Sequence, residues 1–553
     1  MQSVSSSFLS ILEVFAFTSV QDIRRQDDRI IWNFTMITDY VSITLTVAAI
    51  LLALYYYCRN NTENFEKNGI PFRKPLPLLG NTYEPLLAMN SFADMVQDMY
   101  KIHPTAKYVG VFDLMTPAII IRDPELTKSM VVKNFDHFQE RRSFIDENID
   151  PLFGKNLFSL RGERWKEVRN LLTPAFTTSK MKGMFVLMSK CGAEFASVLA
   201  ALPPNERELN VKDAFTRYTS DAIATCAFGI SINSMKDRDN PFYVYGKKAT
   251  TFGVITAIKL FIMRSFPSLM KLFGATFISK EIGMFFKNLV ANTIKTRDEQ
   301  GIVRPDMIQI MMEHRGKMEL TIEDMTAQAL VFFFGGFDST ATAMCFAAHE
   351  IGVNADVQKR LQEEIDNVLE KSNGQLTYEA LNNMPYLDAV VNEALRMYPV
   401  AVFADRRCTK TFELPPTLPG AKPHIMEPGS LIWLPIYGIQ RDPEFFNEPD
   451  KFNPDRFIED GKKLASTGAY FPFGLGPRMC IGNRFALLET KALLFHVFAR
   501  CNFLPCAKTP IPMKLSKKSF AMLPENGFWM EIQPRSNPHP SLATSVCNAS
   551  DKH

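Results

Sequence analysis

One cysteine in this sequence stands where a short glycine-rich loop meets a long helical pattern. Phe473 to Gly482 reads Phe-Gly-Leu-Gly-Pro-Arg-Met-Cys-Ile-Gly, and a predicted helix over Asn483 to Phe503 begins just after Cys480. Unpaired N–H groups and the positive dipole end of a helix favour a thiolate, and we expect the charge of Arg478 to favour it further. Such a thiolate is able to ligate iron, and the glycines let the backbone approach a flat group closely.

The same loop resembles the haem-binding signature of the cytochrome P450 superfamily, Phe-x-x-Gly-x-Arg-x-Cys-x-Gly. Its five fixed positions match at Phe473, Gly476, Arg478, Cys480 and Gly482. The resemblance implies that Cys480 is the metal ligand of haem b and that the other four residues help to bind this cofactor. The alternative is a buried structural cysteine beside a glycine turn, although chance would produce this pattern in roughly one of ten thousand chains of such composition.

Length and composition are those of a large packed protein. The chain has 553 residues, 46% of them apolar, and a formal net charge of +3, which argues against a nucleic-acid partner. Its nine cysteines include no Cys-x-x-Cys pair, which argues against a disulfide framework or a zinc ribbon. Helical patterns dominate, with strand-like runs at Lys107 to Phe112 and Ala118 to Ile121. With the resemblance, this predicts a mainly α fold with small β-sheets, the cytochrome P450 fold, as a single large domain over residues 85–533.

A membrane segment is predicted near the N-terminus. Tyr40 to Cys58 are 19 residues without a charge, and such a helix would span about 28 Å, close to the thickness of a bilayer core. We predict an N-terminal extension over 1–39, a single transmembrane anchor over 40–58, a linker with a proline-rich hinge over 59–84, and a disordered tail over 534–553. A buried helix or a cleaved signal peptide is the alternative for the apolar run.

The orientation of this anchor depends on where translation begins. Three arginines shortly precede the apolar run and four Lys or Arg shortly follow it, so the positive charges on its two sides are nearly balanced. A start at Met36 would leave all nearby cations on the C-terminal side. We therefore expect residues 1–35 to be an unusual or artefactual extension, and the catalytic domain to face the cytosol from the endoplasmic reticulum membrane.

A tryptophan and an arginine one helical turn apart form the second motif. Trp165 and Arg169 match the family's Trp-x-x-x-Arg, which implies that both side chains bond a haem propionate. By the same resemblance Arg406 and Arg478 hold propionates as well. An amphipathic surface helix is the alternative. The remaining cations of this helix are expected to form a patch for an acidic electron donor: Arg161, Arg164 and Lys166.

A structural ion cluster is predicted in the sequence between the Trp-x-x-x-Arg motif and the cysteine loop. Glu393 and Arg396 are spaced i, i+3 on a predicted helix, which alone is typical of a surface pair. Downstream, Phe452-Asn453-Pro454-Asp455-Arg456-Phe457 resembles the family's Pro-x-Arg-Phe segment. The resemblance implies a buried triad of Glu393, Arg396 and Arg456 that stabilises the scaffold of the cysteine loop and takes no part in catalysis.

A glycine pair interrupts the helix that is predicted from Thr321 through Asn354, and a densely charged helical pattern follows it over Ala355 to Lys371. Two glycines there cost about 1 kcal/mol each relative to alanine, which suggests a functional reason. Helical spacing places five residues on one face: Val331, Phe334, Gly335, Asp338 and Ser339. The segment resembles the family's Ala/Gly-Gly-x-Asp/Glu-Thr-Thr motif, which implies that Asp338, Ser339 and Thr340 deliver protons during oxygen activation and that Gly335 lies over the haem. Ser339 replaces the usual threonine and lacks the methyl group that restrains χ1.

The resemblance implies a monooxygenase that inserts one oxygen atom of O2 into lipophilic small molecules, namely xenobiotics such as insecticides or plant compounds. Electrons would come from NADPH through NADPH–cytochrome P450 reductase, with cytochrome b5 as a second candidate donor. The pocket is expected to draw on five segments: Phe144 to Phe158, Phe252 to Phe273, Val331 to Ser339, Val400 to Phe403 and Ala521 to Leu523. Three alternatives remain: oxidation of one endogenous steroid or terpenoid hormone, rearrangement of peroxides, and non-catalytic binding of haem or lipophiles.

Overall fold

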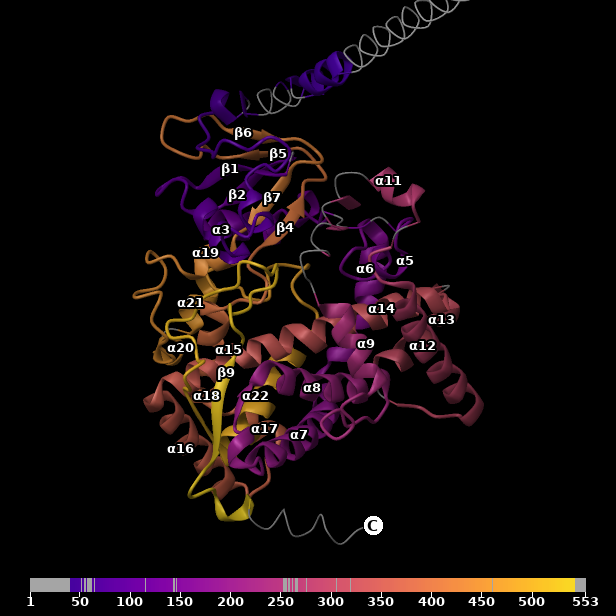
Figure 1. Ribbon diagram of the computed structural model, residues 1–553, viewed down its shortest axis with the longest axis vertical. Coiled ribbons are helices and arrows are strands. Elements are labelled where there is room, and N and C mark those ends of the chain that lie inside the picture. Colours follow the sequence, from indigo (N-terminus) through magenta and orange to yellow (C-terminus); the bar gives the residue numbers. More distant parts are fainter. Residues whose placement is uncertain are drawn as a thin grey trace, which may run out of the picture.

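A computed structural model describes residues 40–542, apart from residues 51, 54–55, 57–61, 64, 115, 143–144, 146, 252–255, 257–258, 261, 264–266, 275, 305, 319 and 460. Helices predominate in this part of the chain, and its strands form three small sheets, which confirms the predicted mainly α fold. The four-stranded sheet lies at one end of the body and most of the long helices lie at the other (Figure 1).

The four-stranded sheet has the order β1-β2-β7-β4: Tyr108–Asp113, Thr116–Ile121, Leu431–Leu434 and Ala404–Arg407. The first two strands form an antiparallel hairpin at the positions where the sequence predicted strands, and β2 pairs with β7 in parallel. The second sheet has the order β3-β9-β8: Glu208–Asn210, Trp529–Pro534 and Cys501–Leu504. The third consists of β5 (Phe412–Leu414) and β6 (His424–Met426).

The proline-rich linker packs onto the first sheet, so the body begins earlier than residue 85. Phe65 and Ile70 are buried, and Phe72 forms a bridge with Gly110 of β1. Gly80 has φ +59°, and a Cβ at this position would lie 2.1 Å from the carbonyl oxygen of Leu114. The predicted hinge is therefore part of the sheet's packing from about residue 65 onward, because Phe65 and Ile70 are buried and Phe72 pairs with β1.

A long helix crosses the whole body and has one widened turn. It consists of α14 (Ile322–Phe334), the π-helical turn η6 (Gly335–Ser339) and α15 (Thr340–Val353). Thr321 and Asp324 form a reciprocal capping box at its start. The charged helix α16 (Ala355–Lys371) follows at the predicted position.

Four further helices surround this one. They are α7 (Thr178–Ala200), α8 (Val211–Ile223), α18 (Pro385–Met397) and α22 (Asn483–Arg500). The last of these begins directly after the cysteine loop, as predicted, and ends three residues earlier than expected, because the chain from Cys501 pairs with β9. Their apolar faces meet in one large core cluster with α14 and α15.

The remaining helices and turns complete the body. In chain order they are α2 Tyr83–Leu86, α3 Phe92–Tyr100, α4 Pro124–Lys128, η1 Ser129–Lys133, η2 Phe135–His137, α5 Pro151–Gly154, α6 Gly162–Leu172, η3 Thr173–Phe176, η4 Pro204–Glu206, η5 Ala224–Phe228, α9 Pro241–Thr250, α11 Pro267–Leu272, α12 Lys280–Gln300, α13 Met307–Met318, α17 Tyr378–Asn382, α19 Ile436–Gln440, α20 Asp455–Glu459, α21 Gly461–Thr467 and η7 Pro540–Leu542.

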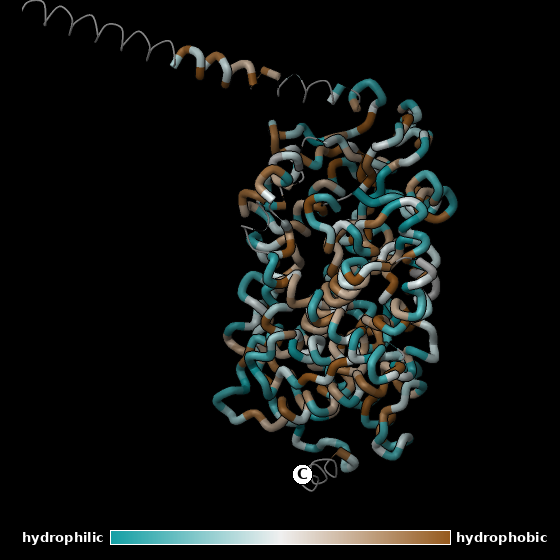
Figure 2. Tube along the Cα trace, turned by 90° about the vertical axis from the view of Figure 1, so that its right-hand side faces the viewer, coloured by the Kyte–Doolittle hydropathy of each residue, from teal (hydrophilic) through white to brown (hydrophobic). Residues whose placement is uncertain are grey.

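The predicted membrane anchor is described only in part. Tyr40–Ile50 is an apolar helix whose side chains are all exposed, and it extends away from the body (Figures 1 and 2). Two longer helices have the length and apolarity of a membrane span, Thr178–Ala200 and Ile322–Val353, but both pack within the body. Residues 1–39, including the predicted extension, lie outside the described residues.

The predicted disordered tail has to be corrected for its first residues. Arg535 forms an ion pair with Asp366 at 2.6 Å, and Pro540–Leu542 forms η7 with Leu542 buried. These contacts order the chain as far as Leu542, because they attach it to α16 and the core. The remaining residues 543–553 lie outside the described part.

Candidate active site

The cysteine loop is closed by its own backbone. Cys480 donates its N–H to the carbonyl oxygen of Phe473 at 2.9 Å, and Met479 donates to Gly476 at 2.9 Å. Gly476 has φ +71°, and a Cβ there would lie 2.1 Å from the carbonyl oxygen of Val131. Only glycine fits this position. Gly482 is the N-cap of α22, so the cysteine side chain lies next to the first turn of that helix.

The environment of Cys480 differs from the prediction in one respect. Burial raises the pKa of its thiol, while the N–H of Gly482 and the charges of Arg141 and Arg169 oppose this shift. The predicted contribution of Arg478 to this pKa is wrong, because its guanidinium donates instead to the carbonyl oxygens of Gln139 and Leu160. A metal ion at Sγ would itself complete the deprotonation of so deeply placed a thiol.

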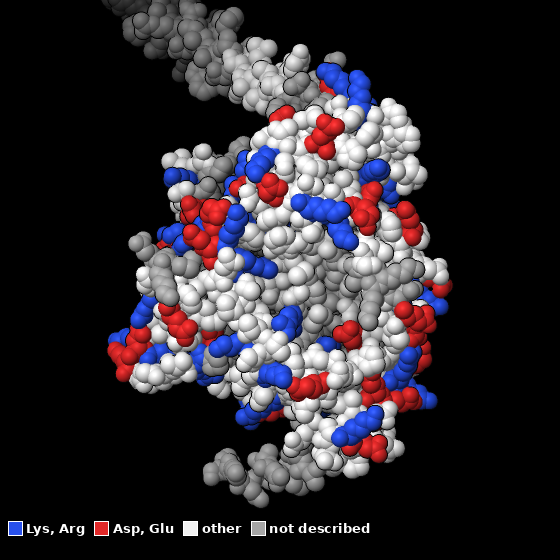
Figure 3. All heavy atoms as spheres, turned by 180° about the vertical axis from the view of Figure 1, so that it is seen from behind, with Lys and Arg blue, Asp and Glu red and all other residues white. Residues whose placement is uncertain are grey.

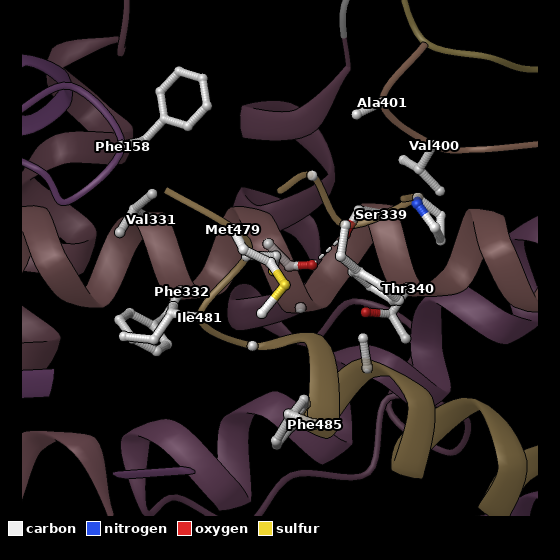
Figure 4. A pocket seen from close by; sticks show the side chains of 18 of the residues that line it. Phe158, Val331, Phe332, Ser339, Thr340, Val400, Ala401, Met479, Ile481 and Phe485 are labelled. Atoms are coloured by element: carbon white, nitrogen blue, oxygen red, sulfur yellow. Dashed lines mark hydrogen bonds between the residues drawn. The ribbon is translucent and has the colours of Figure 1, made fainter. Parts of the chain in front are cut away.

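The Cys480 side chain is exposed to an internal cavity of about 510 Å³. Side chains from the long helix, the cysteine loop and α22 surround this space (Figure 4), and most of them are apolar. Labelled examples are Phe158, Val331, Phe332, Val400, Ile481 and Phe485. A large apolar cavity with a thiol in its wall suits a lipophilic ligand.

The predicted pocket segments are partly correct. Residues of the segments 144–158, 331–339 and 400–403 line the cavity, whereas Ala521 to Leu523 do not, since Met522 packs into the core. Much of the segment 252–273 lies outside the described residues. The sequence analysis missed lining residues from α7, α8 and η5: Met184, Ile223, Cys226 and Ala227. Nothing in their own sequence distinguishes them from ordinary core residues.

Four arginines converge on the same cavity: Arg141, Arg169, Arg406 and Arg478. The Nε atoms of Arg141 and Arg406 are buried without a hydrogen-bond partner. Burial, together with the charge of Arg141, lowers the pKa of Arg406 to about 9 and that of Arg478 to about 8. Asp405 is the only acid among the described lining residues, and it already accepts the N–H of Arg142 at 2.6 Å. The cluster therefore lacks anions, which the two propionates of haem b would supply.

Trp165 belongs to this cluster through stacking. Its ring lies 3.9 Å from the guanidinium carbon of Arg478, whose Nε and Nη2 donate to the carbonyl oxygens of Gln139 and Leu160. The structure thus brings the predicted propionate residues together and adds Arg141, which donates to the carbonyl oxygen of Arg478 at 3.0 Å. Arg141 was missed because the dipeptide Arg141-Arg142 does not show which of its members turns inward.

The three residues of the predicted ion triad meet in the structure. Nε and Nη2 of Arg396 donate to the Glu393 carboxylate at 2.7 and 2.9 Å, and both side chains are 0% exposed. Arg456 Nε lies 3.5 Å from the same carboxylate, and Asn453 donates its N–H at 3.0 Å. Arg396 also donates to the carbonyl oxygen of Gln440 at 2.9 Å. The cluster ties α18 to the chain that leads into the cysteine loop.

The face of the long helix that lines the cavity matches the predicted one only in part. Val331, Gly335 and Ser339 line it, followed at the same four-residue spacing by Ala343 and Ala347. Phe334 and Asp338 were predicted on this face and are not among the lining residues, which corrects the prediction. A π-helical turn shifts residues relative to a regular 3.6-residue spacing, which accounts for the position of Asp338 within it, whereas Phe334 precedes the turn.

The three residues predicted to deliver protons have different surroundings. The Ser339 hydroxyl faces the cavity and donates to the carbonyl oxygen of Gly335 (Figure 4). The Thr340 hydroxyl is buried in the cavity wall without a partner. Asp338 instead lies 3.0 Å from the ammonium of Lys212, on the side of α8. The structure therefore brings the two hydroxyls to the cavity and leaves the carboxylate behind its wall.

The predicted basic patch on α6 is largely neutralised. Arg164 pairs with Glu167 at 3.1 Å and Lys166 pairs with Glu163 at 2.6 Å, both within the same helix. The i, i+3 spacing places each acid beside its cation. Acidic and basic side chains are also interspersed over the face in Figure 3. A strongly basic docking surface on this helix is therefore not supported.

Comparisons with known proteins point to one family. The family described as Cytochrome P450 matches residues 70–530. Cytochrome P450 9e2 of Blattella germanica is 43% identical over 530 residues, which cover 89% of this chain and 98% of the relative. Probable cytochrome P450 9f2 of Drosophila melanogaster is 40% identical, with 88% and 98% covered. Cytochrome P450 6j1 of Blattella germanica is 34% identical, with 90% and 100% covered.

Proposed function

This chain belongs to the cytochrome P450 family, and we propose that it oxidises lipophilic foreign compounds with electrons that NADPH supplies through a separate reductase. Membership makes it a haem b monooxygenase. The haem, when bound, supplies reductive activation of O2, which electron donation from a thiolate ligand favours. The observation that carries the proposal on substrates is the apolar cavity of about 510 Å³ into which Cys480 projects.

Each group of residues at the cavity has a separate task. Cys480 would hold the iron, and the arginine cluster with Trp165 would hold the propionates. The apolar walls exclude water and orient a substrate by shape, because they offer few polar partners. The hydroxyls of Ser339 and Thr340 are placed to pass protons at the wall formed by the long helix.

The substrate class follows from the lining and from the relatives together. Apolar and aromatic side chains predominate in the cavity wall, and a ligand without strong polar anchors can bind in several orientations. The similar chains are P450 enzymes of a cockroach and a fly. This combination supports broad oxidation of compounds such as insecticides and plant products.

We also propose that the enzyme is anchored in the endoplasmic reticulum membrane with its catalytic domain in the cytosol. The exposed apolar helix Tyr40–Ile50 supports this placement. Protease treatment of intact microsomes tests it: the domain from about residue 65 onward is expected to be degraded without detergent. Protection of this domain until the membrane is dissolved would contradict the proposed orientation.

The function is tested with purified protein, reductase, NADPH and a mixed panel of insecticides, plant terpenoids and steroid hormones. We expect turnover of many lipophilic compounds that stops when NADPH or reductase is omitted. Turnover of a single hormone would favour the endogenous-substrate alternative, and conversion of peroxides without NADPH would favour rearrangement. Tight binding without any turnover would favour a binding protein. Addition of cytochrome b5 shows whether it serves as a second donor.

Arg141→Ala is expected to weaken haem retention. The change removes a buried cation from a cluster that lacks anions, and one charged hydrogen bond contributes about 1.5 to 3 kcal/mol, so haem loss should be roughly 10- to 100-fold faster. Haem transfer to an excess of a haem-scavenging protein measures this rate. Arg142→Ala is the matched control, because Arg142 bonds Asp113 and Thr116 instead. Equal haem loss from both variants would contradict the assignment of Arg141.

Gly335→Leu is expected to narrow the substrate range while haem binding survives. Gly335 lines the cavity, and apart from its own helix backbone a Cβ there would meet no atom within 4 Å, so a leucine side chain would extend into the cavity. Large substrates should then lose turnover and small ones should keep it. The same panel, normalised to haem content, measures the effect. Unchanged turnover of the bulkiest substrates would show that they do not pass this wall.

A further inference from the structure

The widened turn of the long helix leaves backbone carbonyl groups that side chains satisfy. Within η6 the regular hydrogen-bond ladder is interrupted, and the carbonyl oxygens of Gly335, Phe337 and Asp338 each accept a side-chain hydrogen bond. Ser339 supplies the bond on the cavity side. The bond to Phe337 comes from α8, which packs against the turn on its opposite side. The carbonyl oxygen of Asp338 accepts one bond from α8 and a second, at 2.8 Å, from the Thr342 hydroxyl of the long helix itself.

Two side chains of α8 bind this turn. The Thr219 hydroxyl donates to the carbonyl oxygen of Phe337 at 2.7 Å. The Lys212 ammonium donates to the carbonyl oxygen of Asp338 at 3.0 Å and to the Thr342 hydroxyl at 2.7 Å. It also lies 3.0 Å from the Asp338 carboxylate. Lys212 therefore binds both the main chain and the side chain of one residue.

These contacts are partly shielded from water. The side chains of Lys212 and Asp338 are 20% and 29% exposed, so their ion pair is less weakened by solvent than a surface pair. The helices also approach closely here, since a Cβ at Gly336 would lie 2.7 Å from Ile223 of α8. The turn is thus held by α8 at several points at once.

We propose that Lys212, assisted by Thr219, is a positioning residue for proton delivery. It keeps the turn widened and keeps the Asp338 carboxylate behind the cavity wall. Without the ammonium, the turn would relax toward a regular helix, and this relaxation would rotate the hydroxyls of Ser339 and Thr340 out of their places. The inference rests on the proposed function for its kinetic consequence, although its structural part stands on the contacts alone.

Amide hydrogen exchange of the full-length protein tests the structural part. In Lys212→Met, exchange over residues 335–342 is expected to be roughly 10- to 100-fold faster, because charge-assisted hydrogen bonds to the turn are lost. Lys212→Arg should restore most of the protection, and Thr219→Val should give a smaller acceleration. Lys155→Met is the matched control: it removes the 2.6 Å ion pair with Glu323 at the start of the same helix and should leave this turn unchanged.

Reconstituted turnover tests the kinetic part. Lys212→Met should lower the product formed per NADPH by up to about 100-fold and release hydrogen peroxide instead, with unchanged substrate affinity and an unchanged reduced carbon monoxide spectrum. Exchange and coupling like those of the unchanged protein, or equal effects of Lys155→Met, would overturn the inference. Absence of NADPH-dependent turnover in the unchanged protein would overturn the proposed function alone, and hydrogen exchange would still decide the role of Lys212.

Discussion

Cys480→Ala is expected to abolish both the haem-thiolate spectrum and substrate oxidation. Cys480 is the cysteine of the loop between Phe473 and Gly482, its side chain is exposed to the cavity, and its backbone is fixed by the bond to Phe473. Alanine keeps the loop geometry but offers no ligand to the iron. The arginines that surround the cavity cannot replace it, since they are cations.

Haem content and the reduced carbon monoxide difference spectrum measure this effect on purified protein. Cys226→Ala is the control, because this thiol also lines the cavity but lies on η5, and its pKa is raised well above the usual range by burial. Cys226→Ala should retain the spectrum. Far-UV circular dichroism establishes that Cys480→Ala is folded, and Cys480→Ser provides a second variant if it is not. An unchanged Soret band and unchanged oxidation in Cys480→Ala would contradict the assignment of the metal ligand.

Glu393→Ala is expected to give the largest loss of stability. The carboxylate is 0% exposed and lies between the guanidinium groups of Arg396 and Arg456. Its removal leaves two buried or nearly buried cations facing each other, and breaking a buried ion pair in this way costs about 3 to 5 kcal/mol. The N–H of Asn453 loses its acceptor as well. Because the cluster joins α18 to the chain before the cysteine loop, we expect failure to retain haem along with the lower stability.

Urea unfolding, followed by haem absorbance and circular dichroism, measures this loss. Asp455→Ala is the control, since Asp455 pairs with Arg360 at the surface next to Arg456, and both partners are more than 40% exposed. Such surface pairs contribute about 1 kcal/mol or less. A comparable loss in the two variants would show that the triad has no special structural role. Retention of haem in Glu393→Ala would show that the cysteine loop is stable without it.

Local features were predicted correctly where neighbouring residues alone determine the conformation. Helix α16 matches its predicted bounds because its apolar stripe and dense charges repeat at helical spacing. The start of α22 was correct because glycine and cysteine at the loop's end precede a regular helical pattern. The end of α22 was wrong because pairing with a distant strand, β9, stops the helix at Arg500.

The sequence identified most of the charged residues of the site but not all of their contacts. The sequence did not reveal Arg141 as a residue of the site. It reaches the cavity only in the folded chain, where it donates a hydrogen bond to the carbonyl oxygen of Arg478. The direction of Asp338 was wrong for a related reason. A regular helical period places it on the cavity face, but contacts with Lys212 and Thr219 of another helix accompany a widened turn that moves it away.

By itself the sequence determined the family and the cofactor and identified Cys480 as the candidate metal ligand, because spacing within one loop carries this information directly. The tertiary structure alone decided that Asp338 pairs with Lys212 and that Arg141 joins the arginine cluster. The physical reason is that burial, charge pairing and hydrogen bonding depend on groups hundreds of residues apart, such as the ion pair of Glu140 with Arg407 or the bond from Arg141 to the carbonyl oxygen of Arg478. No local sequence pattern indicates whether Arg141 or its neighbour Arg142 will point into the cavity when those distant segments pack.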